Sequence, residues 1–127
     1  MDSIPVRAHG AIGAGHLILA TGFLAGAAYY GDVVLGVIGL LNLGLAYSWS
    51  ITPIFTVFHN RVESYNRLGA VRRRVFFVGL DLLEIRGRQI YLRDDRLPAA
   101  DATLGRARDW RKVLSALDVA RGRGAAP

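Results

Sequence analysis

The sequence contains no cysteine among its 127 residues. Disulfide bonds, thiolate metal sites and cysteine nucleophiles are therefore excluded. Charge is also missing from a long stretch, because between Gly10 and Asn60 the only formally charged residue is Asp32. A soluble protein distributes charges along its chain, since every element has an outer face. An uncharged half followed by a charged half indicates a chain that is divided between two solvents.

Lysine is nearly absent, since Lys112 is the one lysine among 16 basic residues. The formal net charge is +6, and 52% of the residues are hydrophobic. A basic excess suits nucleic acid, an anionic membrane surface or an acidic partner. The length is enough for one compact unit but not for two full domains.

Two apolar stretches, at about 11–30 and 33–50, flank the polar pair Gly31-Asp32. A helix of about 20 residues matches the ~30 Å hydrocarbon core of a membrane. We therefore expect residues 1–52 to form a transmembrane helical hairpin that ends before Pro53. A cleaved signal peptide is a weaker alternative, because the first apolar run is longer than a usual h-region. A hairpin buried inside a soluble protein is also a weaker alternative. It would need amphipathic partners to cover it, and the rest of the chain supplies only one good apolar helical stripe.

The flanking charges predict the orientation. Arg7 precedes the first span and Asp32 is the only charge in the turn. The second span is followed by Arg61, Arg67 and the Arg72-Arg73-Arg74 run. The positive-inside rule then places both termini in the cytoplasm and the turn outside. Aromatic residues expected at the two membrane interfaces are Tyr29, Tyr30, Tyr47 and Trp49.

Small residues recur in both predicted spans. Gly22 and Gly26 form a small-xxx-small pair in the first span, and Gly36 and Gly39 thin the second. Small residues allow helix backbones to approach closely within a membrane. We expect these glycines to pack one span on the other, and docking against helices of a larger complex is the alternative.

Two polar residues lie at depth in the predicted spans, His16 and Asn42. Asn42 is expected to donate an interhelical hydrogen bond, of a kind worth about 0.6 kcal/mol on average. His16 is expected to hydrogen-bond at the interface or between the helices. Ligation of haem or chlorophyll by His16 is a weaker alternative, so no cofactor is expected.

Residues 53–118 predict a small, basic α+β domain on the cytoplasmic side. Alternating β-branched and aromatic segments predict an antiparallel meander of four or five strands, at 54–58, 62–65, 74–78, 82–85 and 89–92. Arg86-Gly87-Arg88 is expected as a hairpin tip. A C-terminal helix with Asp101 as its N-cap follows, and its apolar stripe is expected to cover the sheet. Residues 119–127 are expected to be a disordered tail.

The chain resembles a family through three segments that follow the hairpin, PIFTVFHNRVESYNRLG, RRRVFFVGLDLLEIRGRQIYL and RLPAAD. Their order is similar to that of membrane-anchored bacterial proteins with a pleckstrin-homology-like (PH-like) domain, over roughly residues 54 to 118. The resemblance implies a location in the bacterial inner membrane and a role in scaffolding, assembly or surface binding. Some members are similar to assembly factors of photosynthetic membrane complexes. A full domain of this type has seven strands, so four or five strands imply a short version.

No convincing catalytic or metal-binding set is present. His9, His16 and His59 are too dispersed for a zinc site, and no H-x-x-x-H spacing occurs. Asp81 and Glu84 could pair as acid and base, but capping or salt bridges to nearby arginines explain them better. We therefore expect neither an enzyme nor a metal site.

The Arg72-Arg73-Arg74 run is the strongest candidate binding site. Anionic lipid attracts each nearby basic residue by about 1 kcal/mol, whereas the alternative is that the run only fixes orientation. Nucleic acid is not expected, since a membrane-held domain rarely meets it. The leading hypothesis is a non-enzymatic accessory or scaffold subunit that contacts other membrane subunits or anionic lipid headgroups. A standalone lipid- or peptide-binding domain and an assembly factor for an energy-transducing complex are the alternatives.

Overall fold

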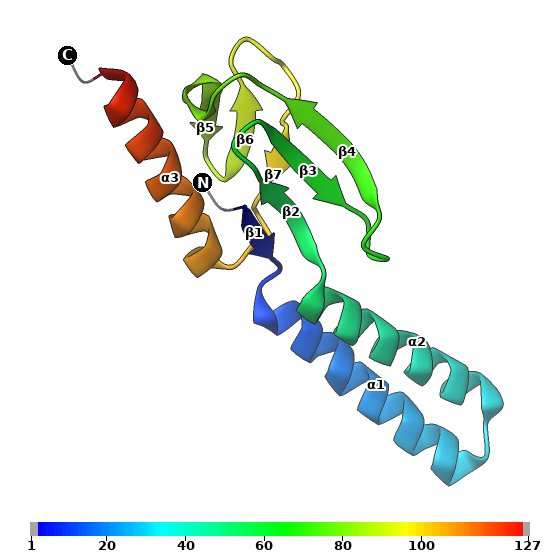
Figure 1. Cartoon of the computed structure of the whole chain (residues 1–127). Coiled ribbons are helices and arrows are strands. Elements are labelled where there is room, and N and C mark those ends of the chain that lie inside the picture. Colours follow the sequence, from blue (N-terminus) through cyan, green and yellow to red (C-terminus); the bar gives the residue numbers. More distant parts are fainter. Residues whose placement is uncertain (1–2, 126–127) are drawn as a thin grey trace.

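The computed structural model describes residues 3–125, which form a long helical hairpin joined at one end to an α+β domain (Figure 1). The hairpin leaves the domain between the first two strands, so both of its ends connect to neighbouring strands. In chain order the elements are β1 (Ile4–Arg7), α1 (Gly10–Tyr30), α2 (Val33–Ile51), β2 (Pro53–Val57), β3 (Arg61–Tyr65), β4 (Val71–Phe76), the 3-10 helix η1 (Leu80–Leu82), β5 (Leu83–Arg86), β6 (Gln89–Leu92), β7 (Ala100–Asp101) and α3 (Ala107–Ala125).

Helices α1 and α2 lie antiparallel and side by side (Figure 1). Gly31 ends α1 in a left-handed conformation with φ 66°, and the Asp32 carboxylate begins α2 by accepting the Val34 N–H at 2.8 Å. Both helices are long and apolar enough to cross a membrane, and only 11% of each apolar window is buried. They match the predicted stretches within about one residue, and α2 ends at Ile51, before Pro53, as expected.

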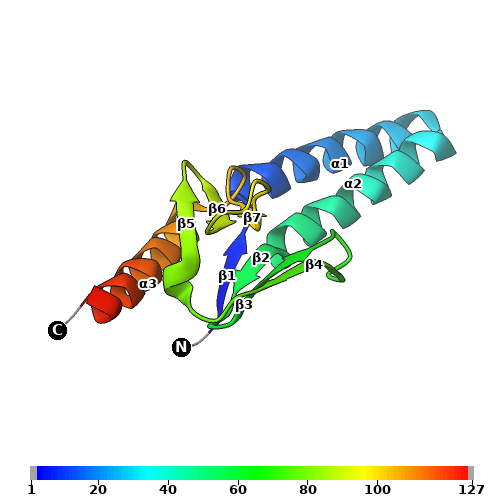
Figure 2. The same ribbon diagram turned by 90° about the horizontal axis from the view of Figure 1, so that it is seen from above.

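The strands form two antiparallel sheets, one of four strands in the order β1-β2-β3-β4 and one of three in the order β5-β6-β7. Strand β1 precedes the hairpin and β2 follows it, yet Ile4 lies opposite Val57 and Val6 opposite Phe55. The helical hairpin is therefore inserted into the connection between two paired strands. Figure 2 shows that the hairpin and α3 extend in opposite directions from the sheets.

The hydrophobic core is formed by the two sheets and α3, which packs on β1 and η1. Trp110, Val113 and Leu117 recur at helical spacing on α3 and are buried, so the predicted apolar stripe does cover the strands. The largest fully buried side chains are Phe55, Leu83, Ile90, Leu117, Val6, Val57, Val62 and Val113.

The prediction of four or five strands is wrong, because the described residues form seven. The two strands without a sequence signal are β1, which lies on the other side of the hairpin from its partner, and β7, which has two residues. Residues 4–7 therefore belong to the sheet, although the predicted boundary at residue 52 placed them with the hairpin. The β5–β6 hairpin was predicted correctly, with Arg86 opposite Gln89 and Gly87 at φ 65°.

The C-terminal helix also differs from its prediction at both ends. Asp101 is not its N-cap, because α3 begins at Ala107 and Asp101 lies in β7, where its carboxylate accepts the Thr103 N–H at 2.8 Å. At the other end α3 continues to Ala125, so residues 119–125 of the expected tail are helical. The rest of that predicted tail, residues 126–127, lies outside the described residues.

Candidate functional site

The predicted arginine run lies on β4, but its three side chains do not form one patch. Successive side chains of a strand point to opposite faces. Arg74 lies opposite Glu63 in β3, and its Nε donates to Glu63 Oε1 at 3.1 Å. Arg73 points the other way, and its Nη1 donates to the carbonyl of Pro98 at 2.9 Å. Within the described residues, only Arg72 of the three has no such partner.

Several other arginines connect elements of the domain. Because the guanidinium has five donors in a fixed fork, it can bond main-chain carbonyls that a lysine would reach at one point only. These contacts join Arg88 to Ala102 and Gly105, Arg93 to Asp81, Arg106 to Ala8 and Arg121 to Leu83. Part of the positive charge therefore stabilises the domain and is not free to bind a partner.

Three of the four predicted packing glycines face the opposite helix of the hairpin. A Cβ added at Gly39 would lie 2.7 Å from Leu24 Cγ, and Cβ atoms at Gly26 and Gly36 would lie 3.5 Å and 3.7 Å from side-chain atoms of the neighbouring helix. A Cβ at Gly22 would meet nothing within 4 Å. Gly22 therefore lies on the outer surface of the hairpin, away from the opposite helix.

The polar pair within the hairpin is interhelical. His16 Nδ1 lies 3.1 Å from Asn42 Oδ1, and Asn42 Nδ2 donates to the Ile38 carbonyl of its own helix at 3.0 Å. With this arrangement of the amide, Asn42 accepts the interhelical bond and does not donate it as predicted. The bond engages one ring nitrogen of His16 in helix packing.

Of the two acidic residues considered for chemistry, Glu84 is engaged in ion pairs. Glu84 is paired with Arg86 at 3.2 Å and with Arg93 at 3.8 Å. Across residues 3–125 no group of three or more His, Asp or Glu side chains could hold a metal ion. The structural interpretation of Glu84 therefore agrees with its observed contacts.

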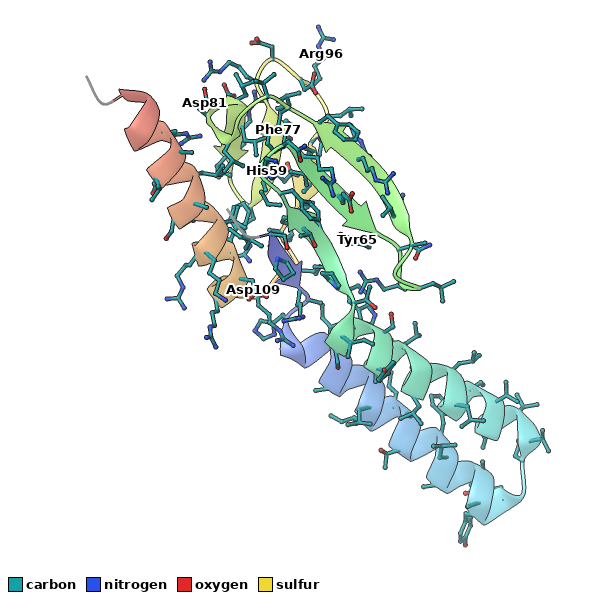
Figure 3. The ribbon with its side chains drawn as sticks, in the orientation of Figure 1. His59, Tyr65, Phe77, Asp81, Arg96 and Asp109 are labelled. Atoms are coloured by element: carbon teal, nitrogen blue, oxygen red, sulfur yellow. The ribbon has the colours of Figure 1, made fainter. Side chains whose placement is uncertain are left out.

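Hydrogen bonds join residues 7–9, which lead into α1, to residues 104–109 at the start of α3. Asp109 accepts the Arg7 N–H at 3.1 Å, and Arg106 Nε donates to the carbonyl of Ala8 at 2.9 Å. The His9 N–H donates to the carbonyl of Leu104 at 2.7 Å. Figure 3 places Asp109 beside β1, close to the point where α1 leaves the domain, whereas Arg96 lies at the far end. This network limits rotation of the domain about the hairpin.

Two further contacts join the end of α2 to the β3–β4 turn, residues 66–70. Ser48 Oγ donates to the carbonyl of Arg67, and the Arg67 guanidinium carbon lies 4.1 Å from the centroid of the Trp49 ring. The turn itself is well defined, because Asn66 Oδ1 accepts the N–H groups of Leu68 and Ala70 at 2.9 Å and 3.0 Å. The cation–π contact therefore joins the end of α2 to a hydrogen-bonded turn.

Behind this contact lies a cavity of about 220 Å³, which we call the junction cavity. It is lined by Trp49, Ile54, Arg67, Asp101, Thr103 and Leu104. Arg67 Nη1 is itself shielded from solvent and has no hydrogen-bond partner in the described part of the chain, and burial lowers the pKa of Arg67. A hydrogen bond from the Thr103 side chain lowers the pKa of Asp101, so this carboxylate stays ionised. The cavity combines a cation and an anion on partly apolar walls.

Sequence reasoning did not identify the junction cavity. It treated Trp49 as an interfacial aromatic and Arg67 as part of the topogenic charge, and it assigned Asp101 to a helix cap. The available signal was an aromatic and an arginine on either side of the expected membrane boundary. That signal does not show that β7 brings Asp101 to the same place.

Comparisons with protein-family models, with curated proteins and with solved structures found no match to this chain.

Proposed function

We propose that the chain is a two-pass membrane protein whose PH-like domain acts at the membrane surface as a non-enzymatic scaffold or accessory subunit. The observation that carries this proposal is the exposed, apolar lateral surface of the hairpin, which continues directly into the sheet. Its large exposed side chains include Leu17, Ile18, Leu19, Val33, Val34, Val37, Leu40 and Leu41. Soluble proteins rarely expose apolar surface on this scale, so lipid or partner helices are its natural environment.

The position of β1 supports an anchor over a removable signal. Strand β1 precedes α1 and contributes Val6 to the core of the domain. Cleavage after α1 would remove this strand together with the first helix. We therefore infer that the hairpin is retained in the folded protein and is not cleaved off.

The PH-like assignment is supported by the number and order of the elements. Sheets of four and three antiparallel strands followed by a C-terminal helix supply the seven strands that the resemblance implies. The first of the seven is β1, so the membrane hairpin occupies the β1–β2 connection. On this proposal the domain is of full length and not a short version.

The cytoplasmic side is assigned to the domain because its surface carries the basic residues. The far end of the hairpin has only Asp32 as a charged residue. Both termini then lie on the cytoplasmic side of a bacterial inner membrane, and partners are other membrane subunits or anionic lipid headgroups.

Two measurements test the proposal. Extraction of membranes with alkaline carbonate should leave the full chain in the pellet, whereas release without detergent would refute the anchor. Native mass spectrometry after purification in mild detergent should show the chain in stoichiometric association with other membrane proteins. Recovery of the chain alone would refute the subunit role.

A variant locates the partner-facing surface. Gly22→Leu adds bulk where a Cβ meets nothing within 4 Å, so it should leave the hairpin folded but weaken partner binding. Val37→Leu, at an exposed position that is already bulky, is the control. Equal retention of partners by both variants would exclude the Gly22 face.

The junction cavity favours a second candidate, a standalone anchored domain that binds lipid. Its partly buried cation lies at the end of α2, where lipid headgroups would be within reach. A chain that is recovered alone but retains lipid would support this candidate over the subunit role.

A further inference from the structure

The junction cavity is lined by an arginine that has a donor without an acceptor. Arg67 Nη1 is shielded from solvent, and no described group accepts its hydrogen bond. A buried charged donor is unfavourable unless it is paired. The guanidinium is nevertheless held in place by the Trp49 ring, and the Arg67 main chain by the Ser48 hydroxyl. A ligand in the cavity that supplies an acceptor would remove the unfavourable term once the guanidinium turns an N–H toward it.

A phosphate oxygen is the acceptor that suits this arginine. The planar guanidinium matches the geometry of phosphate, and stacking on an aromatic ring leaves its N–H edge free. No acidic side chain in the described chain pairs with Arg67 within 4.0 Å. The cation is therefore available to an incoming anion.

Asp101 gives the cavity a second recognition element. Its Oδ1 accepts the N–H of Thr103 at 2.8 Å and also the hydroxyl of Thr103, and its Oδ2 accepts from Gln89 Nε2 at 3.1 Å, so the carboxylate is oriented. An ionised carboxylate offers about four lone-pair positions, which leaves capacity for one more donor. A primary ammonium can donate to it, whereas a quaternary ammonium has no N–H to give.

The size and place of the cavity indicate a headgroup. Its volume of about 220 Å³ is below the range of about 300–1,000 Å³ that is typical for drug-sized ligands. Trp49 lies in the last turn of α2, which ends at Ile51. With α2 in the membrane, this level corresponds to the headgroup layer.

We infer that the junction cavity binds the headgroup of an aminophospholipid, a phosphodiester that carries a primary ammonium, as in phosphatidylethanolamine. Arg67 binds the phosphate, Asp101 binds the ammonium, and the acyl chains remain beside α2. This inference rests on the membrane anchor proposed above and would make the domain selective for one lipid class.

The test is native mass spectrometry of the delipidated full chain in detergent. Phosphatidylethanolamine, phosphatidylcholine and phosphatidylglycerol are added singly at equal concentration. The wild type should retain phosphatidylethanolamine about tenfold more than either of the other lipids, the size expected for one charged hydrogen bond. Equal retention of the three lipids overturns the inference, and this comparison does not depend on any variant being folded.

Three variants assign the roles. Arg67→Gln should reduce phosphatidylethanolamine retention about tenfold, and Asp101→Asn should reduce it to the level of phosphatidylcholine. Arg72→Gln removes the same charge from an exposed position on β4 and should leave the lipid ratio unchanged. Unchanged phosphatidylethanolamine retention in Arg67→Gln, or a lipid ratio that survives Asp101→Asn, overturns the inference.

Two further controls separate the possible causes of failure. Free glycerophosphoethanolamine at the same concentration should not displace the lipid, and displacement would refute a lipid source for the ligand. Carbonate extraction of Arg67→Gln should still leave the chain in the membrane. A retained chain without lipid preference refutes the headgroup site alone, whereas a released chain refutes the anchor.

Discussion

Replacing Glu63 by glutamine tests the cluster of charged residues around Glu63. The cluster lies on the four-stranded sheet, on the face opposite to the core residue Val62. Glu63 Oε1 accepts from Arg61 Nε at 2.8 Å and from Arg74 Nε at 3.1 Å, and its Oε2 accepts from the Tyr65 hydroxyl at 3.1 Å. The side chain of Glu63 is only 9% exposed. Its carboxylate therefore has little contact with water and depends on these three donors.

The magnitude follows from the number of donors and from their exposure. A hydrogen bond to a charged group contributes about 1.5–3 kcal/mol. The side chains of Arg61 and Arg74 are 30% and 55% exposed, so solvent reduces their share. Glutamine keeps the shape and one acceptor oxygen. We expect Glu63→Gln to lower the free energy of unfolding by about 1.5–3 kcal/mol, the value of one charged hydrogen bond.

The effect should depend on pH. The hydrogen bond from Arg61 is the main reason that the pKa of Glu63 is below its ordinary value of 4.5, and burial opposes this effect. A carboxyl group with a lowered pKa stabilises the fold fully above its pKa in the unfolded chain, and it loses that contribution as the pH falls through its folded pKa. The difference between wild type and variant should therefore be constant above about pH 5.5 and should shrink below pH 4.5.

The assay is urea unfolding of the full chain in mild detergent, followed by the fluorescence of Trp110 in a Trp49→Phe background. Trp110 lies in the core of the domain, so its emission reports on the sheets and α3. Glu84→Gln is the control, because the side chain of Glu84 is 38% exposed and its loss should cost less than about 0.5 kcal/mol. Equal effects of the two substitutions, or a difference that persists at low pH, would refute the reasoning.

Further substitutions test close contacts elsewhere in the chain. Gly39→Ala places a Cβ 2.7 Å from a leucine of α1 and should destabilise the hairpin by about 1–3 kcal/mol, whereas Gly22→Ala should not; thermal unfolding followed by circular dichroism would distinguish them. Gly105→Ala places a Cβ 2.8 Å from Val6 Cγ1 and should lower the urea midpoint of the domain, and an unchanged midpoint would contradict that packing.

The hairpin could be predicted because its signals are local. Two uncharged apolar runs of the right length, the Gly31-Asp32 turn and Pro53 all lie within one continuous segment. Each of them acts on the backbone within a few residues. The observed helices accordingly begin and end close to the predicted positions.

Strand β1 could not be predicted in the same way. It has four residues, and its partner β2 follows only after the whole hairpin. A segment that short has little periodicity, and its pairing is decided by burial of Val6 against distant strands. Strand β7, with two residues, gives an even weaker pattern.

The arginine run shows that consecutive charges in a sequence do not form one surface patch when they lie on a strand. Period-two alternation alone predicts that Arg73 and its two neighbours point to opposite faces. The junction cavity, in contrast, depends on burial of a donor by residues from three separate segments. Burial of this kind is a property of the folded chain and has no pattern in the sequence.

The short connections at the base of the hairpin couple the domain to the two helices. Thr52 is the single residue between α2 and β2, and two residues separate β1 from α1. Arg106 also contacts Ala8 just before α1, and Arg67 contacts Trp49 near the end of α2. We expect these contacts and the short connections to restrict rotation of the domain relative to the hairpin. Insertion of Gly-Ser-Gly-Ser after Thr52 should therefore keep the chain in the membrane but separate Arg67 from Trp49 and remove the preference for phosphatidylethanolamine. If the preference survived the insertion in native mass spectrometry, the cavity would not depend on a fixed junction, and the domain alone would be sufficient to select its lipid.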